Sequence, residues 1–411
     1  MAVNHLKEFV CIRCQTSHAP EPSLYTCRIC GGNLDARYDY NTIGTLLTSD
    51  RLGRNPDTSL WRYAPFLPTG LDFSPLSLPV GMTPLSKALR LGQRLGMTDL
   101  WIKNDTLNPS GSFKDRASLM ILAHCLENNL PIISAASTGN AGTSMACLAA
   151  AAGSRAIIFV PESAPRAKIV QLMIYGARVF LVRGDYRQAF ELCETVSNRL
   201  GWFNRNTGTN PYTREGKKTV SFELWEQMGY ACPDAVVVSV GDGNIISGVY
   251  KGFYDLYQAN LIPKIPRIIG VQAEKSAAIS NAFHGDGILR RVTATSLADS
   301  ICAAFPSDGE AALAAVERSG GTFVTLSDER ILDSIKTLAQ TEGVFAEPSG
   351  AAGVGGIQAL LDKGKIAPAE RVVLIVTGSG LKDVDSAFKV TGMPGTIDPD
   401  PEQVIAAVKE V

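Results

Sequence analysis

The stretch Ser112-Phe113-Lys114-Asp115-Arg116 decides how this sequence is interpreted. It follows the turn-forming Asn108-Pro109-Ser110-Gly111 and precedes an Ala-, Leu- and Met-rich run over residues 117–125, so Lys114 is predicted in the first turn of a helix. A lysine there can form a Schiff base with an aldehyde cofactor. It can also transfer protons when burial and nearby cations lower its pKa. Taken alone, such a lysine is more often an ordinary helix-start residue.

Outward from this stretch, short apolar strands alternate with helices. The pattern predicts strands at residues 100–103, 132–134, 156–160, 179–182, 235–240, 267–271 and 371–376. Helices are predicted at 141–152, 167–175, 187–199 and 328–341, and a short one after Asp398-Pro399-Asp400-Pro401-Glu402. Strands unbroken by polar residues are typical of parallel sheets covered by helices on both faces, so we expect an α/β protein. Residues 41–80, rich in Pro, Asp and aromatics, are predicted to be irregular.

The first forty residues form a unit of their own. Two CxxC pairs, separated by twelve residues and followed by Gly31-Gly32, present four thiols: Cys11, Cys14, Cys27 and Cys30. This spacing is typical of a zinc ribbon, in which four sulfurs hold a structural ion and leave no open position for chemistry. A redox CxxC is the alternative. The pattern therefore predicts a zinc-ribbon-like module at residues 1–40.

Composition narrows the class of protein. The 411 residues are 45% hydrophobic and 19% charged, which is typical of a soluble globular protein, and the length predicts two domains plus a small module. The 39 positive and 40 negative residues nearly cancel, so no basic patch predicts a nucleic-acid partner. No apolar run reaches the roughly 18 residues that span a membrane, and no secretory pattern opens the chain. We therefore expect a cytoplasmic protein that binds neither nucleic acid nor a membrane.

Three further turns carry polar groups at strand ends. Ser137-Thr138-Gly139-Asn140 precedes a predicted helix, where backbone N–H groups can bind a carboxylate; a plain helix cap is the alternative. The run from Val240 to Gly248 joins a buried strand to a helix through glycines that fit a monophosphate better than a dinucleotide. Val376-Thr377-Gly378-Ser379-Gly380 follows the last strand and offers a neutral hydroxyl. A glycine turn that closes the sheet is its alternative.

These four segments, in this order, resemble the fold-type II pyridoxal-phosphate enzymes, the group that includes the tryptophan synthase β-like proteins. Within this group the chain is most similar to the threonine synthases. The resemblance runs from about Gly81 to Asp383, and a cysteine-rich N-terminal ribbon also occurs in relatives. Further matching pieces are Gly81-x-Thr83-Pro84-Leu85, Glu215-Gly216-Lys217-Lys218-Thr219 and Glu347-Pro348-Ser349-Gly350-Ala351.

The resemblance implies a role for each matching residue. Lys114 would hold the cofactor covalently and act as the catalytic base, Asn140 would meet the ring hydroxyl, and Thr377 the pyridine nitrogen. The other implied cofactor-binding residues are Phe113 and the phosphate cradle Gly241, Asp242, Gly243, Asn244 and Ile245. The implied substrate-binding residues are Ser137, Thr138, Gly139, Asn140, Ala141, Thr143 and Arg214.

The sequence departs from the threonine synthase pattern around the substrate. Threonine synthases typically carry a threonine where Ala141 stands and an arginine where Thr213 stands, one residue before Arg214. Their phosphate cradle also has a longer glycine turn. Two reactions are therefore carried forward. One converts O-phosphohomoserine to threonine, and the alternative is a β-replacement or β-elimination on O-phosphoserine, as in cysteate synthase.

The resemblance also implies an architecture of two open parallel-sheet α/β domains. The large cofactor-binding domain would comprise residues 41–114 and 226–411, and a small domain at 115–225 would close on an amino-acid substrate. A homodimer is expected by the same analogy. Two alternative functions come from other classes of protein. One is a catalytically silent binding protein, which Lys114 argues against. The other is a zinc-ribbon nucleic-acid adaptor, which the balanced charge argues against.

Overall fold

A six-stranded sheet forms the larger half of the molecule in this computed structural model, which describes residues 4–71, 74 and 76–408. Its strand order is β12-β11-β10-β13-β5-β4, and every neighbouring pair is parallel except β4 with β5. The strands are β4 (Leu85–Lys87), β5 (Leu100–Asn104), β10 (Ala235–Ser239), β11 (Arg267–Ala273), β12 (Phe323–Leu326) and β13 (Val372–Val376).

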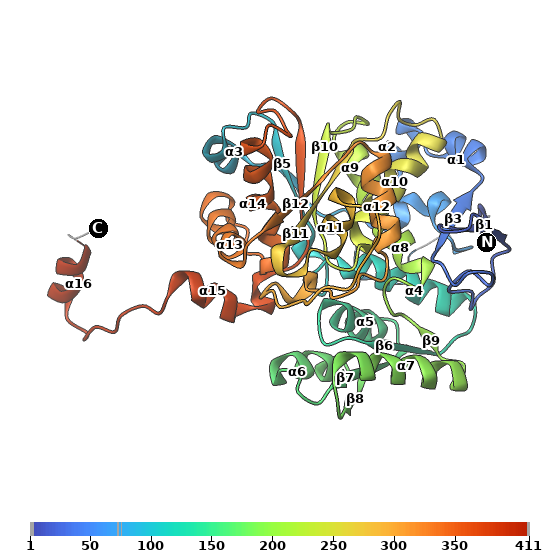
Figure 1. Cartoon of the computed structure of the whole chain (residues 1–411), viewed down its shortest axis with the longest axis horizontal. Helices are drawn as coiled ribbons and strands as arrows, with labels where there is room; N and C mark the ends of the chain where they lie inside the picture. Colours follow the sequence, from blue (N-terminus) through green and yellow to red (C-terminus); the bar gives the residue numbers. More distant parts are fainter. Residues whose placement is uncertain (1–3, 72–73, 75, 409–411) are drawn as a thin grey trace.

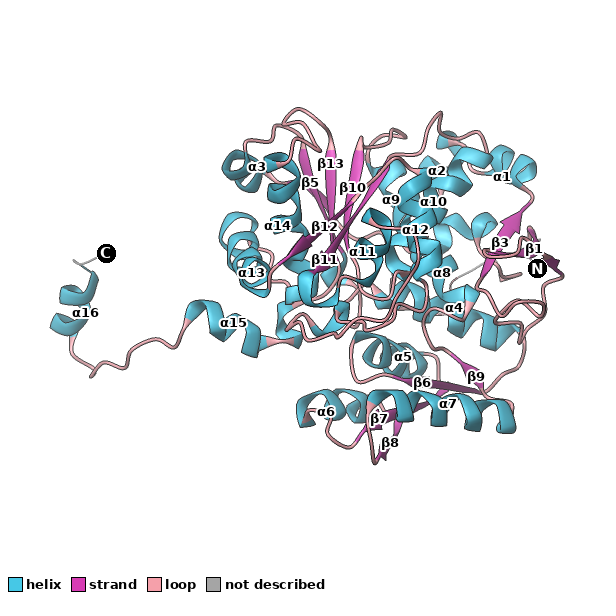
Figure 2. Cartoon of the chain, in the orientation of Figure 1, coloured by secondary structure: helices cyan, strands magenta, loops and turns pink. Residues whose placement is uncertain are grey.

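Helices cover both faces of this sheet because its central strands are apolar on both sides. Along β10, Val236 and Val238 point into one hydrophobic cluster, whereas Ala235 and Val237 point into another. The second cluster is completed by α3 (Leu89–Leu95), α13 (Asp328–Glu342) and α14 (Pro348–Asp362). The opposite face carries α8 (Pro211–Lys217), α9 (Thr219–Gln227), α10 (Asn244–Gln258), α11 (Ala278–His284) and α12 (Gly309–Arg318) (Figure 2).

A four-stranded parallel sheet forms the smaller half, with the order β8-β7-β6-β9. Its strands are β6 (Ile132–Ala136), β7 (Arg155–Pro161), β8 (Arg178–Val182) and β9 (Phe203–Asn204). The helices α4 (Lys114–Glu127), α5 (Asn140–Ala151), α6 (Arg166–Ile174) and α7 (Tyr186–Leu200) belong to this half (Figure 1). Two parallel α/β sheets confirm the predicted fold class, while the domain boundaries at 114/115 and 225/226 stay predictions.

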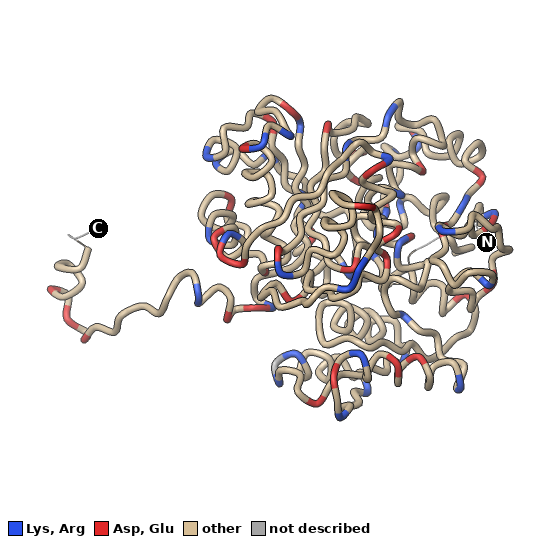
Figure 3. Tube along the Cα trace, in the orientation of Figure 1, with Lys and Arg blue, Asp and Glu red and all other residues tan. Residues whose placement is uncertain are grey.

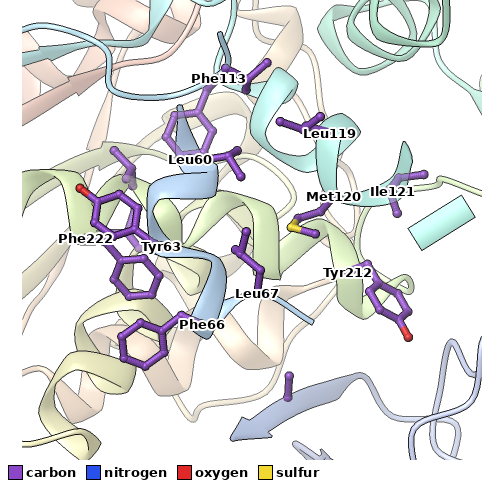
Figure 4. Packing of buried hydrophobic residues seen from close by; sticks show 14 of the residues in the cluster. Leu60, Tyr63, Phe66, Leu67, Phe113, Leu119, Met120, Ile121, Tyr212 and Phe222 are labelled. Carbon is purple, nitrogen blue, oxygen red and sulfur yellow. The ribbon is translucent and has the colours of Figure 1, made fainter. Parts of the chain in front are cut away.

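The segment predicted to be irregular, residues 41–80, contains regular structure, and this expectation was wrong for its first half. It folds into α1 (Tyr40–Leu46), α2 (Ser49–Arg54) and the 3₁₀ helix η1 (Leu60–Phe66). The helices α1 and α2 begin at Asp39 and Thr48, whose side chains accept hydrogen bonds from backbone N–H groups three residues on. In η1, Phe66 stacks on Phe222 with ring centroids 4.7 Å apart. The aromatic residues of η1, Trp61, Tyr63 and Phe66, are therefore core residues (Figure 4).

The N-terminal module is a three-stranded antiparallel sheet with the order β2-β1-β3. It comprises β1 (Leu6–Cys11), β2 (Ser17–His18) and β3 (Leu34–Tyr38), and β3 packs against α8. At the other end, α15 (Val384–Thr391) packs against α13, and a long tail then carries α16 (Pro401–Val408) away from the body (Figure 1). The predicted terminal helix is thus present. The remaining 3₁₀ turns are Asp105–Leu107, Glu274–Ser276, Asp299–Ile301 and Gly380–Lys382.

Charge is spread evenly over the fold. Lysine and arginine are interspersed with aspartate and glutamate along the trace (Figure 3), and the formal net charge is −1. Within the described ranges, no helix is long and apolar enough to cross a membrane.

Candidate active site

An inner cavity lies at the carboxyl ends of β10 and β13, where α4, α5, α10 and α14 begin. In open parallel sheets this edge is where ligands bind, because loops diverge there and helix N-termini point inward. The residues that line the cavity are Lys114, Asn140, Thr207, Lys217, Ser239, Val240, Gly241, Asp242, Gly243, Asn244, Ile245, Ile246, Ser300, Ile301, Glu347, Ser349 and Thr377.

Lys114 is the first residue of α4, as predicted, and its side chain lines this cavity. The turn before it is fixed by Asp115, whose carboxylate accepts hydrogen bonds from the Ser110 backbone N–H (2.7 Å) and hydroxyl (2.5 Å). Burial, and then the guanidinium of Arg205, lower the pKa of Lys114 to about 8. A lysine in this state is neutral in part of the population near neutral pH and can act as a nucleophile or base.

The turn between β10 and α10 requires glycine at two positions. A Cβ at Gly241 would lie 2.7 Å from the Cα of Ile301, and one at Gly243, where φ is +89°, would lie 2.7 Å from the carbonyl oxygen of Asp308. The side chain of Asp242 anchors the turn by accepting from the Ser307 N–H (3.0 Å) and hydroxyl (2.7 Å). The first N–H groups of α10 therefore face the cavity without intrahelical acceptors.

Asn140 and Glu347 meet across the cavity. The Asn140 side-chain nitrogen donates to Glu347 Oε1 at 2.9 Å, which joins the start of α5 to the start of α14. Burial raises the pKa of Glu347, whereas Asn140 and Lys114 lower it by smaller amounts. Glu347 and Lys114 thus line the same cavity, and the charge of each influences the pKa of the other.

An outer cavity adjoins the inner one and shares Asn140, Ser300, Glu347 and Ser349 with it. Its remaining lining residues are Thr138, Gly139, Thr143, Lys168, Gln171, Asp299, Pro348, Lys382 and Asp383. The Lys168 amine contacts Asp299 at 2.6 Å, and burial lowers the pKa of Lys382. Four of the predicted substrate-binding residues line this cavity together: Thr138, Gly139, Asn140 and Thr143.

The structure does not bring every predicted residue to these cavities. The Phe113 side chain packs in the core beside Leu60 (Figure 4), although its backbone N–H donates to the Thr377 carbonyl at 2.8 Å. Arg214 points elsewhere: it donates to Asp308 Oδ1 (2.5 Å) and the Leu34 carbonyl (2.9 Å). Neither Ser137 nor Ala141 contributes to the lining.

The buried polar residues of the inner cavity that were absent from the predicted site are Lys217, Ser239, Glu347 and Ser349. The side chain of Lys217 is fully buried, and the Ser239 hydroxyl has no hydrogen-bond partner among the described residues. Lys217 and Glu347 belong to motifs that matched the family, so these motifs were the signal that could have identified them. Ser239 had no such signal, because a serine at a strand end is common.

The residues present fit pyridoxal phosphate. The turn packs so closely on the backbone of Ile301 and Asp308 that Gly241 and Gly243 have no room for a Cβ, the Ser239 hydroxyl lacks a partner among the described residues, and a lysine of lowered pKa lines the same cavity. Lys114 would hold the aldehyde carbon, the α10 N-terminus the phosphate, and Asn140 and Thr377 the ring. These roles stay predictions.

The four ribbon cysteines also come together. The sulfur atoms of Cys11, Cys14, Cys27 and Cys30 all lie within 4.8 Å of one another, and His18 Nε2 lies 3.2 Å from Cys27 Sγ. Four thiols at this separation suit a tetrahedral ion such as zinc. The module is tied to the larger half by Asn33, whose side chain donates to the Ser307 carbonyl and to Asp308 Oδ1, both at 2.8 Å.

The sequence of this chain matches a family of known proteins. The sequence model of the family described as pyridoxal-phosphate dependent enzyme matches residues 76–378. A threonine synthase of Methanocaldococcus jannaschii is 34% identical over 404 residues, which cover 98% of this chain and 99% of the relative. A threonine synthase of Methanosarcina acetivorans is 34% identical over 407 residues and covers 98% of both chains.

Solved structures agree with the fold. The processed form of threonine deaminase isoform 2 from Solanum lycopersicum matches with a TM-score of 0.66 at 24% identity, covering 75% of this chain and 82% of that one. Maize serine racemase matches with a TM-score of 0.65 at 23% identity, covering 75% and 91%. At these identities the likeness shows the fold alone.

Proposed function

The chain belongs to the family of pyridoxal-phosphate dependent enzymes and is a lyase, and we propose that it converts O-phosphohomoserine and water into threonine and inorganic phosphate. The observation that carries this proposal is the pair of joined cavities. The inner cavity holds Lys114 and the glycine cradle, and the outer one places two amines, Lys168 and Lys382, beside the start of α5.

Each residue has a task in this reaction. When bound, pyridoxal phosphate supplies an electron sink for the negative charge left at the α-carbon of the amino acid. Lys114 removes the proton from that carbon, because a pKa of about 8 leaves part of it neutral near neutral pH. Thr138 and Gly139 hold the substrate carboxylate at the start of α5. The Thr377 hydroxyl is a neutral partner for the pyridine nitrogen, which favours elimination and replacement over transamination.

The outer cavity suits the phosphate of the substrate. Lys168 and Lys382 are cations, and Thr143 adds a hydroxyl on the same wall. Charged hydrogen bonds of this kind contribute roughly 1.5–3 kcal/mol each. This set replaces the threonine and arginine that family members typically carry at the positions of Ala141 and Thr213, since Arg214 is engaged by Asp308.

The absence of those two family residues also favours a second candidate reaction. A β-replacement on O-phosphoserine uses a substrate one carbon shorter, so its phosphate would lie nearer to Lys114. Thr207, which lines the inner cavity, would then offer it a hydroxyl.

The deciding experiment is to incubate the cofactor-loaded protein with O-phospho-L-homoserine and to measure threonine and phosphate together. Equal production of both is the expected result. No product, with the visible cofactor band intact, would contradict the proposal, and O-phosphoserine with sulfite would be tried next. The matched control is Lys168→Gln, which should raise KM for the phosphorylated substrate without altering the cofactor band.

A structural zinc ion, a homodimer and a cytoplasmic location complete the proposal. The cysteine cluster supports the zinc ion, and metal analysis of the purified protein would test it. Analytical ultracentrifugation would test the dimer, and cell fractionation the location.

A further inference from the structure

Lys217 has an unusual environment for a lysine. It is the last residue of α8, its side chain is 0% exposed, and it lines the inner cavity together with the glycine cradle. The Lys217 amine donates to Asn244 Oδ1, and no carboxylate of the described chain lies within ion-pair distance of it. Burying an ammonium group without a counter-charge destabilises a fold, so its retention requires a reason.

The next residue shows what a structural lysine looks like in this fold. Lys218 is also 0% exposed, but its amine contacts both Glu215 and Asp255, the latter at 2.7 Å. The two lysines are adjacent in sequence and equally buried, yet only Lys218 has its charge matched by the protein.

The positive charge of Lys217 is not balanced by the charged residues around it. Burial, then Lys114, then Arg205 lower its pKa far below the ordinary value, and Asp308 and Asp242 raise it by less. Both carboxylates are engaged elsewhere. Asp308 accepts from Arg214 and Ser247, and Asp242 accepts from Ser307.

The groups opposite Lys217 are those that bind phosphate. Asn244, its hydrogen-bond partner, is the first residue of α10, a helix of 15 residues whose N-terminus carries partial positive charge. Ser239 ends the preceding strand, and its buried hydroxyl has no partner among the residues described, although it lines the same cavity. An amine without a counter-charge, a hydroxyl without a hydrogen-bond partner among the described residues and the N–H groups at the start of α10 thus surround one space.

We propose that Lys217 is a ligand of the cofactor's phosphate and supplies the full positive charge that the glycine cradle lacks. The proposal rests on the family assignment but not on the identity of the substrate. The phosphate of a substrate is the other possible source of the same chemistry. We assign the cofactor phosphate to Lys217 because the amine lies at the α10 N-terminus, whereas Lys168 and Lys382 line the outer cavity.

The test compares pyridoxal phosphate with pyridoxal, which lacks the phosphate, in wild-type protein and in Lys217→Gln. Glutamine removes the charge but can still donate to Asn244. Binding is read from the visible absorbance band and the protein fluorescence of cofactor-free protein. We expect Lys217→Gln to weaken pyridoxal phosphate about 10- to 100-fold, the effect of one charged hydrogen bond, and to leave pyridoxal affinity unchanged.

Two outcomes would overturn the proposal: unchanged affinity for pyridoxal phosphate, or an equal loss for both compounds, which would indicate a structural role. Lys168→Gln is the matched control and should alter neither affinity. If Lys217→Gln raised KM for O-phosphohomoserine but kept cofactor affinity, Lys217 would bind the substrate phosphate instead. A failed threonine assay would overturn the proposed reaction and leave these binding results standing.

A measurement on wild-type protein covers the case in which the variant does not fold. In the loaded protein, the ³¹P resonance of the cofactor should keep its dianion position as the pH falls through about 6, the ordinary second pKa of a phosphate monoester. A resonance that titrates at the ordinary value would rule out an ammonium partner.

Discussion

Two clusters of buried charge lie near the first turn of α4, and they are built in opposite ways. Arg116 and Lys103 are 0% exposed and pair with Asp105 and Glu223, which are equally buried. Lys114 and Lys217, which line the inner cavity, and Arg205, whose charge acts on Lys114, appear in no ion pair of the described chain. In the first cluster the protein supplies both signs of charge, and the charge is structural. In the second it supplies cations alone among the described residues, and this is where we propose that an anionic ligand binds.

Burial disfavours the charged form in both clusters, but neighbouring charges of opposite sign compensate fully for it at Glu223 of the first cluster and not at Arg205 of the second. Burial alone would raise the pKa of Glu223, but Arg116 and Lys103 lower it to about 2. Burial lowers the pKa of Arg205 to about 10, because Tyr186 and Asp115 compensate only in part. The guanidinium of Arg205 donates to hydroxyls alone, to Thr207 at 2.6 Å and to Ser118 at 3.5 Å.

The largest expected effect comes from Lys114, in the cluster whose positive charges have no carboxylate partner among the described residues. Lys114→Ala should lose the visible cofactor band and all measurable turnover, because it removes both the covalent anchor and the base. Its free energy of unfolding, measured in urea without cofactor, should not fall, since no carboxylate is left unpaired. A variant that retained the band and turnover would refute the assignment of Lys114.

Removing one carboxylate from the ion-paired cluster around Arg116 should instead destabilise the fold. Glu223→Gln leaves Arg116 and Lys103 with one carboxylate between them, and breaking a buried pair of this kind costs about 3–5 kcal/mol. Urea unfolding monitored by fluorescence would measure it. A loss below 1 kcal/mol would show that the cluster adjusts without Glu223.

Acid sharpens the same prediction. The folded pKa of Glu223 is about 2, below the value of roughly 4.3 in an unfolded chain, so its contribution to stability is complete above pH 4.3 and is lost as the pH falls toward 2. The free energy of unfolding of Glu223→Gln should therefore fall less between about pH 4.3 and 2 than that of the wild-type protein. If the two proteins lost the same free energy over this range, the prediction would be wrong.

A smaller effect is expected from Arg205→Gln. Because the positive charge of Arg205 helps lower the pKa of Lys114, its removal should raise that pKa above about 8. Only the neutral amine reacts, so capture of pyridoxal phosphate at pH 7 should slow several-fold and its pH midpoint should shift upward. Stopped-flow absorbance would record the profile, and an unchanged midpoint would mean that burial alone sets the pKa.

The smallest effect belongs to an exposed pair. Arg13 of the ribbon contacts Glu310 at 2.7 Å, with about half of each side chain exposed. Surface pairs of this kind contribute about 0–1 kcal/mol. Arg13→Gln should therefore leave the urea midpoint nearly unchanged, and a large shift would indicate that the ribbon is held mainly by this contact.

The sequence predicted the fold class and the turns that line the inner cavity, because both depend on local patterns. Alternating apolar runs specify parallel strands, and glycine turns after strands specify where helices begin. It could not separate Lys217 from Lys218, since their difference depends on Glu215, Asp255 and the cavity. Arg214 was predicted at the substrate by its place in a motif, yet Asp308, 94 residues later, binds its guanidinium.

The strand order of the large sheet has a consequence for synthesis. β5 ends at Asn104 and pairs with β13, which begins at Val372, so about 270 residues must be translated before the sheet can close. At roughly 5–20 residues per second this takes on the order of 15–50 s. The strands of the small sheet are complete long before then. The nascent chain therefore carries an open β5 edge through most of translation, which makes its release before β13 emerges the step most exposed to aggregation.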